Sequence, residues 1–311
     1  MTLISPTIDQ AKIQSWERNF IVLAEQRDSM LSNLPGVEYV AFEGSKHNFP
    51  RASKVEMQKL QGRNPKIQYN EFDYDNRQMT KQSFGYSIMF DKNDNLEMMD
   101  DPTSTAYQEV MTALNRQKDR IIAEACFANI LCGDPNSNQS LTSVSAEDDG
   151  VKTIDATGGL TYTLLKSGLI NFMNNSVTTG DLMSANLSFI CAGTDIGQLL
   201  EEAKFINNDF TASRPVDNGY ITKILGMNVV ALPGSHTENI SLSKTILNES
   251  GTTRDCILLA PKAIKFTIDN LRIDIKDNLD GYYRSKAIVV SADLGAMRTE
   301  GARVQKIQTT F

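Results

Sequence analysis

Apolar residues near the N-terminus recur at the spacing of one helix face. The pattern runs from Ile8 to Leu31 and stops at Pro35 and Gly36, which disfavour a helix. Its members are Ile8, Ala11, Trp16, Phe20, Leu23, Ala24, Met30 and Leu31. The pattern predicts an amphipathic helical arm within residues 1–40.

The next segment, residues 41–100, is polar and has the pattern of extended chain. Short alternating runs at residues 67–69 and 84–90 indicate strands, and the mostly polar stretch 70–82 separates them. Such a segment has too few apolar residues to build a core of its own. We therefore predict a hairpin-like excursion that leans on another surface, because an isolated two-stranded ribbon is marginal in water.

A long helix is predicted after the Asp-Pro pair at residues 101–102. Thr105 and Gln108 have the spacing of a capping box, and Gly133 with Pro135 ends the pattern, which gives a helix of roughly thirty residues. The apolar stripe of this helix consists of Val110, Met111, Leu114, Ile121, Ile122 and Ala125.

The polar side of this helix places opposite charges three and four residues apart. The pairs are Arg116 with Asp119, and Arg120 with Glu124. As exposed surface pairs they would contribute about 0.3–0.5 kcal/mol each at most. A solvated face and a role at an interface both remain open.

The rest of the chain alternates between loop, helix and strand patterns. Residues 134–159 are rich in Asp, Asn, Ser, Thr and Gly, which predicts a surface loop. The expected central elements are a helix at 162–174, a strand at 187–192, a helix at 194–207 that Asp195 and Gln198 open as a capping box, and a strand pair at 220–232 that turns at Gly226. The expected C-terminal strands are 256–260, 264–275, 282–291 and 297–309.

Composition is that of a globular protein, because 41% of the 311 residues are apolar and 22% are charged. The longest apolar stretches fall far short of the roughly 20 residues that cross a bilayer, and no signal-peptide pattern opens the chain, so no membrane partner is expected. The four cysteines lack the spacing of a disulfide framework or a zinc site, so we expect small buried side chains. They are Cys126, Cys132, Cys191 and Cys256.

The formal net charge is −7. A protein that grips nucleic acid along its backbone needs a basic excess, which this chain lacks. If the protein meets DNA, we expect it to enclose the DNA without sequence-specific binding.

No catalytic motif is present in the sequence. Phosphate-binding glycine loops, the nucleophile elbow and the zinc-protease helix motif are absent. The two histidines, His47 and His236, lie in polar, turn-like segments, where we expect surface positions. The acidic doublets 100–101 and 201–202 point apart in any regular element, so they are poor catalytic pairs. We therefore predict no catalytic, cofactor-binding or metal-binding residues.

Charge is unevenly distributed within the excursion. Residues 51–66 carry Arg51, Lys54, Lys59, Arg63 and Lys66 against one glutamate, and residues 91–101 carry Asp91, Asp94, Glu97, Asp100 and Asp101 against one lysine. One hypothesis is that the basic part rests on the acidic surface of a neighbouring copy, where complementarity sets register. Self-pairing within one subunit, or simple solvation, is the alternative.

Several short motifs, in this order, resemble those of major capsid proteins of tailed bacteriophages. They are residues 20–31 (Phe-Ile-Val-Leu-Ala-Glu-Gln-Arg-Asp-Ser-Met-Leu), residues 43–51 (Glu-Gly-Ser-Lys-His-Asn-Phe-Pro-Arg), the Asp-Pro at 101–102 with Tyr107, Arg116 and Asp119, and residues 295–301 (Gly-Ala-Met-Arg-Thr-Glu-Gly). The resemblance covers essentially the whole chain.

This resemblance implies the α+β Hong Kong ninety-seven-like capsid fold. Its parts would be an N-terminal arm at 1–40, an E-loop at 41–100, a peripheral domain with a spine helix at 101–185, an axial domain at 186–254 and peripheral C-terminal strands at 255–311. It implies hexamers and pentamers that assemble in the host cytoplasm into a virion shell around genomic DNA. Expected partners are a separate scaffolding protein, a portal protein and a decoration protein.

The candidate residues for subunit contacts follow from this reading. Those in and around the excursion are Arg51, Lys54, Lys59, Arg63, Asp94 and Glu97, and the apolar anchors of the arm are Trp16 and Phe20. Two other functions remain open at this point. One is an encapsulin-like nanocompartment shell, which shares the fold but houses enzymes. The other is a hydrolase or transferase that uses carboxylates and a metal.

Overall fold

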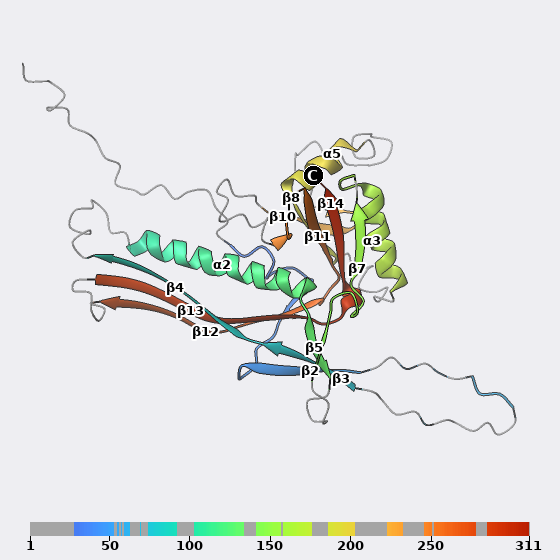
Figure 1. Cartoon of the computed structure of the whole chain (residues 1–311), viewed down its shortest axis with the longest axis horizontal. Coiled ribbons are helices and arrows are strands. Elements are labelled where there is room, and N and C mark those ends of the chain that lie inside the picture. The colour runs from blue at the N-terminus through green and yellow to red at the C-terminus, as the bar shows by residue number, and fades with distance from the viewer. Residues whose placement is uncertain are drawn as a thin grey trace, which may run out of the picture.

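The structure is a computed structural model, shown in Figure 1. It describes residues 28–52, 74–91, 103–133, 141–156, 158–175, 186–202, 223–232, 246–250, 252–277 and 285–310, together with 55, 57, 59–62 and 69. The predicted arm helix therefore lies almost wholly outside the described residues, as does His236.

A long four-stranded sheet with one helix on its face forms the extended half of the molecule (Figure 1). Its strands, in spatial order, are β1 (Val37–Tyr39), β12 (Ile264–Asp277), β13 (Ser285–Arg298) and β4 (Gln82–Asp91). Helix α2 (Thr103–Phe127) packs along this sheet, mainly on β13. The apolar stripe of α2 and alternate residues of β13 share one buried cluster, whose members include Val110, Leu114, Ile122, Val290, Ala292 and Leu294.

A six-stranded mixed sheet forms the compact half. Its order is β7 (Lys152–Ala156), β14 (Val304–Thr310), β11 (Thr253–Leu259), β8 (Ser188–Ala192), β10 (Met227–Leu232) and β9 (Lys223–Ile224). Helices α3 (Tyr162–Asn174) and α5 (Gly193–Glu201) bury Phe172 and Leu199 in a cluster with Phe189 on one face of the sheet, whereas Ile190 on the other face joins the cluster of α2. Strand β8 is buried throughout, as expected for a continuous apolar strand covered on both faces.

A small antiparallel sheet connects these halves. Its order is β2 (Lys46–Ala52), β3 (Tyr74–Thr80), β5 (Ile130–Gly133) and β6 (Thr142–Val144). Strand β5 continues almost directly from the end of α2. Strand β3 is followed after one residue by β4, so the same stretch of chain passes from the small sheet into the long one.

Strand β4 differs from the sequence prediction. The alternating run at 84–90 was predicted to belong to the excursion, but it pairs with β13 in register from Gln82 opposite Leu294 to Asp91 opposite Ser285. The physical reason is that Phe84 and Ile88 point to the core beneath α2 and pack against it. The excursion is therefore shorter than residues 41–100, and its described base is the β2–β3 pair.

The C-terminal strands also differ from the prediction. Residues 282–291 and 297–309 were predicted as separate strands, but β13 continues to Arg298 and the break falls at the short 3-10 helix η3 (Gly301–Arg303). Strands β11 and β14 pair in the six-stranded sheet with β8 and β7. The compact half thus combines strands that the sequence divided between the ranges 101–185, 186–254 and 255–311.

Several local predictions are confirmed. Helix α3 has the predicted bounds, and β9 and β10 turn at Leu225 and Gly226, both with positive φ.

Helix α5 begins one residue earlier than expected, so Asp195 is not its N-cap. The Asp195 carboxylate instead accepts a bond from the backbone N–H of Ala192, and Gln198 accepts one from the N–H of Leu160.

Helix α2 carries one buried carboxylate on the side that the sequence left as solvated or interfacial. Asp119 is fully buried, and its side chain accepts bonds from the Ser29 hydroxyl (2.5 Å) and the backbone N–H groups of Met30 (3.0 Å) and Leu31 (3.1 Å). The buried N–H of Leu31 is thereby satisfied away from water, and the partly buried N–H of Met30 shares the same acceptor group. Asp119 fixes the segment before β1 to the middle of the helix.

Asp119→Ala should lower the free energy of unfolding by about 2 kcal/mol, because it leaves the buried N–H of Leu31 and the partly buried N–H of Met30 without this acceptor. Ser29→Ala removes only the hydroxyl donor and should cost about 1 kcal/mol. Urea unfolding of both variants measures the difference. Equal losses in the two variants would contradict the assignment.

The thiols should differ in reactivity. Cys126, Cys191 and Cys256 are buried and Cys132 is partly exposed, all without a disulfide. Burial raises the pKa of Cys126 to about 12 and also raises the pKa of Cys132, so thiolate is scarce in both, but only Cys132 is open to solvent. Near pH 8 a disulfide reagent should titrate Cys132 slowly in the folded protein and all four thiols after unfolding. Cys132→Ser should abolish the native-state reaction.

Candidate interaction surfaces

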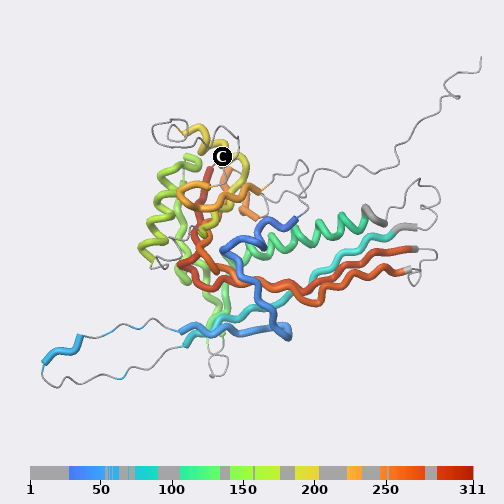
Figure 2. Tube along the Cα trace, turned by 180° about the vertical axis from the view of Figure 1, so that it is seen from behind, coloured from blue at the N-terminus to red at the C-terminus, as the bar shows by residue number. Residues whose placement is uncertain are grey.

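The segment between β2 and β3 exposes apolar side chains. Val55, Met57, Leu60 and Tyr69 are all among the exposed large apolar residues. Figure 2 shows the described stretch 59–62 well away from the sheets and helices. Large exposed apolar side chains gathered on one segment mark an interaction site, so the excursion has the surface expected of a contact with another chain.

The base of this excursion is fixed by aromatic and cationic contacts. The rings of Phe42 and His47 stack with centroids 4.9 Å apart, and Phe49 meets His47 edge-on at 4.6 Å. The Lys81 ammonium lies 4.1 Å from the Phe42 ring centroid and 2.8 Å from an Asp269 carboxylate oxygen on β12. The hydrogen bond from Lys81 lowers the pKa of Asp269. These contacts tie the excursion's base to the long sheet.

A buried ion cluster fixes the same base from the other side. The Asp149 carboxylate binds the Arg77 guanidinium of β3 through both oxygens, and it accepts a 2.8 Å bond from Arg298 Nε on β13. Arg298 also donates to the Cys126 and Ala128 carbonyls at the end of α2. A cation at a helix C-terminus is favoured by the helix dipole, so Arg298 caps α2 as well as pairing with Asp149.

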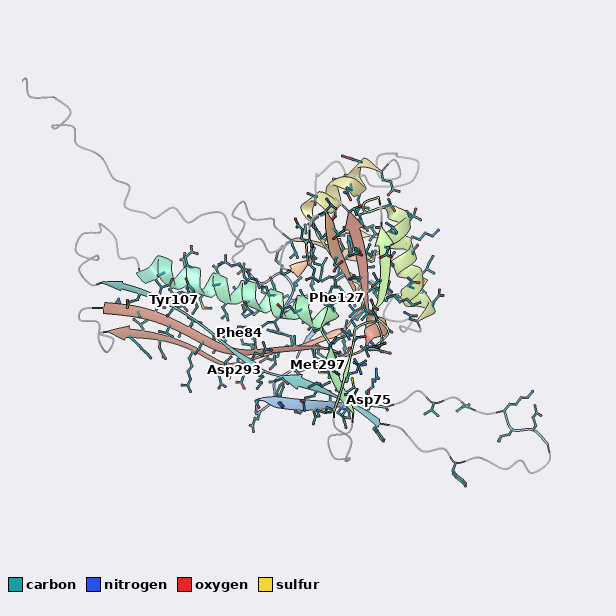
Figure 3. The ribbon with its side chains drawn as sticks, viewed as in Figure 1. Asp75, Phe84, Tyr107, Phe127, Asp293 and Met297 are labelled. Atoms are coloured by element: carbon teal, nitrogen blue, oxygen red, sulfur yellow. The ribbon has the colours of Figure 1, made fainter. Side chains whose placement is uncertain are left out.

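Close backbone approach surrounds this cluster. A Cβ on Gly301 would lie 2.4 Å from the Asp149 carbonyl oxygen, and one on Gly295 would lie 3.0 Å from the Thr80 carbonyl oxygen. Figure 3 labels Asp75, Met297 and Phe127, which mark β3, β13 and the end of α2 around this junction. In the motif at 295–301, Arg298 therefore belongs to the ion cluster, and Gly295 and Gly301 lie where segments of the backbone approach most closely.

A cleft of about 270 Å³ opens beside the cluster. We call it the basic cleft, and its lining residues are Glu38, Phe49, Pro50, Arg51, Arg77, Lys262, Lys265, Thr299, Glu300 and Arg303. Five of these residues are basic and two are acidic. Its aromatic wall is Phe49, over whose ring the Lys265 ammonium lies at 4.2 Å. This arrangement suits a ligand that is both anionic and partly apolar.

A second groove, of about 330 Å³, lies between α2 and the edge strand β4. Phe84, Tyr86 and Val110 form apolar parts of its wall, and Arg116 and Arg120 line its polar side. Strand β4 has no strand partner on its outer edge in the described sheet. The N–H and C=O groups along that edge are therefore not paired with another described strand.

The structure places two of the eight predicted contact residues. Arg51 lies in the basic cleft and pairs with Asp75 at 2.9 Å, whereas Lys59 is exposed on the outlying stretch 59–62. Lys59 is not among the residues that line the cleft, so the two are not brought together there. The other six lie outside the described residues: Trp16, Phe20, Lys54, Arg63, Asp94 and Glu97. The sequence reading missed Lys262, Lys265 and Arg303 in the cleft, because residues from η3 and the start of β12 join β2 only through the fold.

No group of three or more metal-ligating side chains occurs among the described residues. None of the helices that the structure describes is long and apolar enough to cross a membrane. His47 is exposed, as expected for a surface position.

Comparison with known families matches the chain to the model described as phage capsid protein, over residues 8–310. The chain belongs to the phage capsid protein family. The match spans nearly the whole chain, so the family resemblance drawn from short motifs is confirmed. As a major capsid protein, the chain forms the shell of a phage head. Membership in this family implies a structural role, and it favours the phage shell over the nanocompartment and the metal-dependent enzyme that the sequence left open.

Solved structures from several phages share this fold. The capsid of Helicobacter pylori bacteriophage KHP30 matches with a TM-score of 0.71 at 11% identity, covering 100% of this chain and 99% of that chain. The capsid of cyanophage Pam1 matches with a TM-score of 0.70 at 10% identity, covering 99% and 98%. The chain from Mycobacterium phage Che8 matches with a TM-score of 0.65 at 12% identity, covering 95% and 96%. A search of curated proteins found no match.

The capsid protein should depend strongly on Asp149. Asp149→Asn leaves two buried guanidinium groups without their counter-charge and should lower the free energy of unfolding by roughly 3–5 kcal/mol. Asp75→Asn breaks the exposed Arg51 pair and should cost less than about 1 kcal/mol. Denaturant unfolding of both variants tests the contrast. A loss below 1 kcal/mol for Asp149→Asn would contradict the central role of the cluster.

Proposed function

We propose that this capsid protein assembles as hexamers and pentamers into an icosahedral shell around double-stranded DNA, and that the excursion between β2 and β3 supplies contacts in trans. The observation that supports it is the exposure of Val55, Met57, Leu60 and Tyr69 on a segment without a core of its own. Burying a large apolar side chain stabilises a contact by about 1.5–3 kcal/mol, so each copy gains when the segment lies on a neighbour.

The parts of the fold suit this function. In this proposal, the chain before β1 is the arm, the stretch between β2 and β3 is the E-loop, α2 is the spine helix of the peripheral domain, and the six-stranded sheet with α3 and α5 is the axial domain. The candidate contacts from the sequence remain part of the proposal: Trp16, Phe20, Arg51, Lys54, Lys59, Arg63, Asp94 and Glu97.

Other partners follow from the same proposal. A separate scaffolding protein sets the size of the shell, a portal protein occupies one vertex, and a decoration protein binds the outer surface. The net charge of −7 supports a shell that contains DNA without gripping it, because counterion release needs a basic excess.

Met57→Ser with Leu60→Ser should reduce the yield of closed shells at least about tenfold, because each loses a contact worth roughly 1.5–3 kcal/mol. The matched control is Ile170→Ser with Met173→Ser, two exposed apolar residues on α3. Electron microscopy and light scattering of the purified protein, alone and with the candidate scaffold, give the yield. Urea unfolding should show both pairs as stable as the parent.

Two results would count against the proposal. Unchanged shells from the Met57 and Leu60 pair would remove the excursion as a contact. A parent protein that stays monomeric at high concentration, with and without scaffold, would remove shell building itself.

A further inference from the structure

The basic cleft holds positive charge that its own chain leaves uncompensated. Lys262 and Lys265 have no acidic partner among the described residues, although Glu38 and Glu300 share the cleft. Arg77 is only 2% exposed, and its Nε is buried without an acceptor in the part of the chain that the structure describes. The Arg77 guanidinium is already paired with Asp149, so Lys262 and Lys265 carry the cleft's unpaired positive charge.

The chain itself contains a segment with the complementary chemistry. Residues 91–101 carry five carboxylates and one lysine, with Leu96, Met98 and Met99 between them. Carboxylates would pair with the lysines, and the apolar side chains would cover Phe49 and Pro50. This acidic stretch joins the end of β4 to the start of α2.

The ends of the acidic stretch lie far from the cleft of the same molecule. Asp91 pairs with Ser285, next to the distal end of β12, while Lys265 stands near the beginning of β12. Twelve residues separate Lys265 from Asp277 on that strand, which at about 3.3 Å per residue is roughly 40 Å. Figure 1 shows the end of β4 and the start of α2 together at this distal end.

The stretch is too short to reach back. Residues 92–102 connect Asp91 and Thr103, so a loop that leaves and returns has about half its length available. At roughly 3.5 Å per residue this gives a reach of about 20 Å, half of what is needed. Only another molecule can bring such a stretch to the cleft.

We propose that the acidic stretch 91–101 of a second copy of this chain docks in the basic cleft. The inference rests on the proposed function, since it concerns the contacts between shell subunits. The contact joins different surfaces of the two copies, so it is heterologous and generates closed assemblies when the rotation between copies closes. Electrostatic complementarity of this kind sets the register of neighbours.

A charge-swap experiment tests the docking. One variant carries Lys262→Glu with Lys265→Glu, and a second carries Asp94→Lys with Glu97→Lys. Each should reduce the shell yield at low salt roughly tenfold, because like charges meet at every such contact. The variant with all four substitutions should recover at least half of the parental yield. Lys152→Glu, an exposed lysine on β7, is the control for a change in net charge.

Cross-linking of the unmodified protein gives an independent measurement. A carbodiimide joins lysines to carboxylates that are in contact, and a mixture of isotope-labelled and unlabelled copies separates links between molecules from links within one. We expect links between copies from Lys262 or Lys265 to residues of the acidic stretch. Urea unfolding identifies any swap variant that is merely destabilised.

The outcomes separate the inference from the function it rests on. The docking is wrong, while the shell function stands, if the parent and the control form shells but the variant with all four substitutions recovers no yield. The same conclusion follows if both double-substitution variants assemble like the parent. Absence of cross-links between copies in assembled shells also overturns the docking. If the parent forms no shells with or without scaffold, the proposed function fails and the docking fails with it.

Discussion

A single buried carboxylate joins the parts of this fold. Asp149 sits between Arg77 of the small sheet and Arg298 of the long sheet, and the chain continues from Asp149 into the six-stranded sheet. Two guanidinium groups share one carboxylate, so the remaining positive charge is offset by carbonyl oxygens at the end of α2 and by the Arg298 carbonyl. Buried charges are costly unless they are compensated this closely. The cluster therefore fixes the base of the excursion relative to both larger sheets.

The buried carboxylates and the lysines of the basic cleft differ in whether their own chain supplies a partner. Asp119, Asp149 and Asp195 are buried and bind donors of their own chain, which holds the body together. The lysines of the basic cleft and the apolar side chains of the excursion find no such partner among the described residues. A shell subunit needs both kinds of site, because a rigid body must present surfaces that only a neighbour can satisfy.

The sequence predicts local elements well and long-range contacts poorly. Helix α3, most of α2 and the β9–β10 turn follow from periodicity and from glycine at the turn, which are local properties. The run at 84–90 was misplaced because its partner, β13, lies about two hundred positions later in the chain. Asp119 looked like half of a surface pair, but its donors are 88 to 90 positions away. The basic cleft could not be predicted for the same reason, because its lining residues come from segments that are far apart in the sequence.

The length of the long sheet keeps the acidic stretch and the basic cleft of one molecule apart. Strands β12 and β13 each run for 14 residues, so whatever lies at their distal end is separated from the β2–β3 base by tens of ångströms, at roughly 3.3 Å per residue. Both strands also lie under α2, which keeps that separation fixed. Complementary features held this far apart on a stiff body cannot neutralise one another in cis. Because they remain available in every copy, the proposed docking would join each copy to a further one.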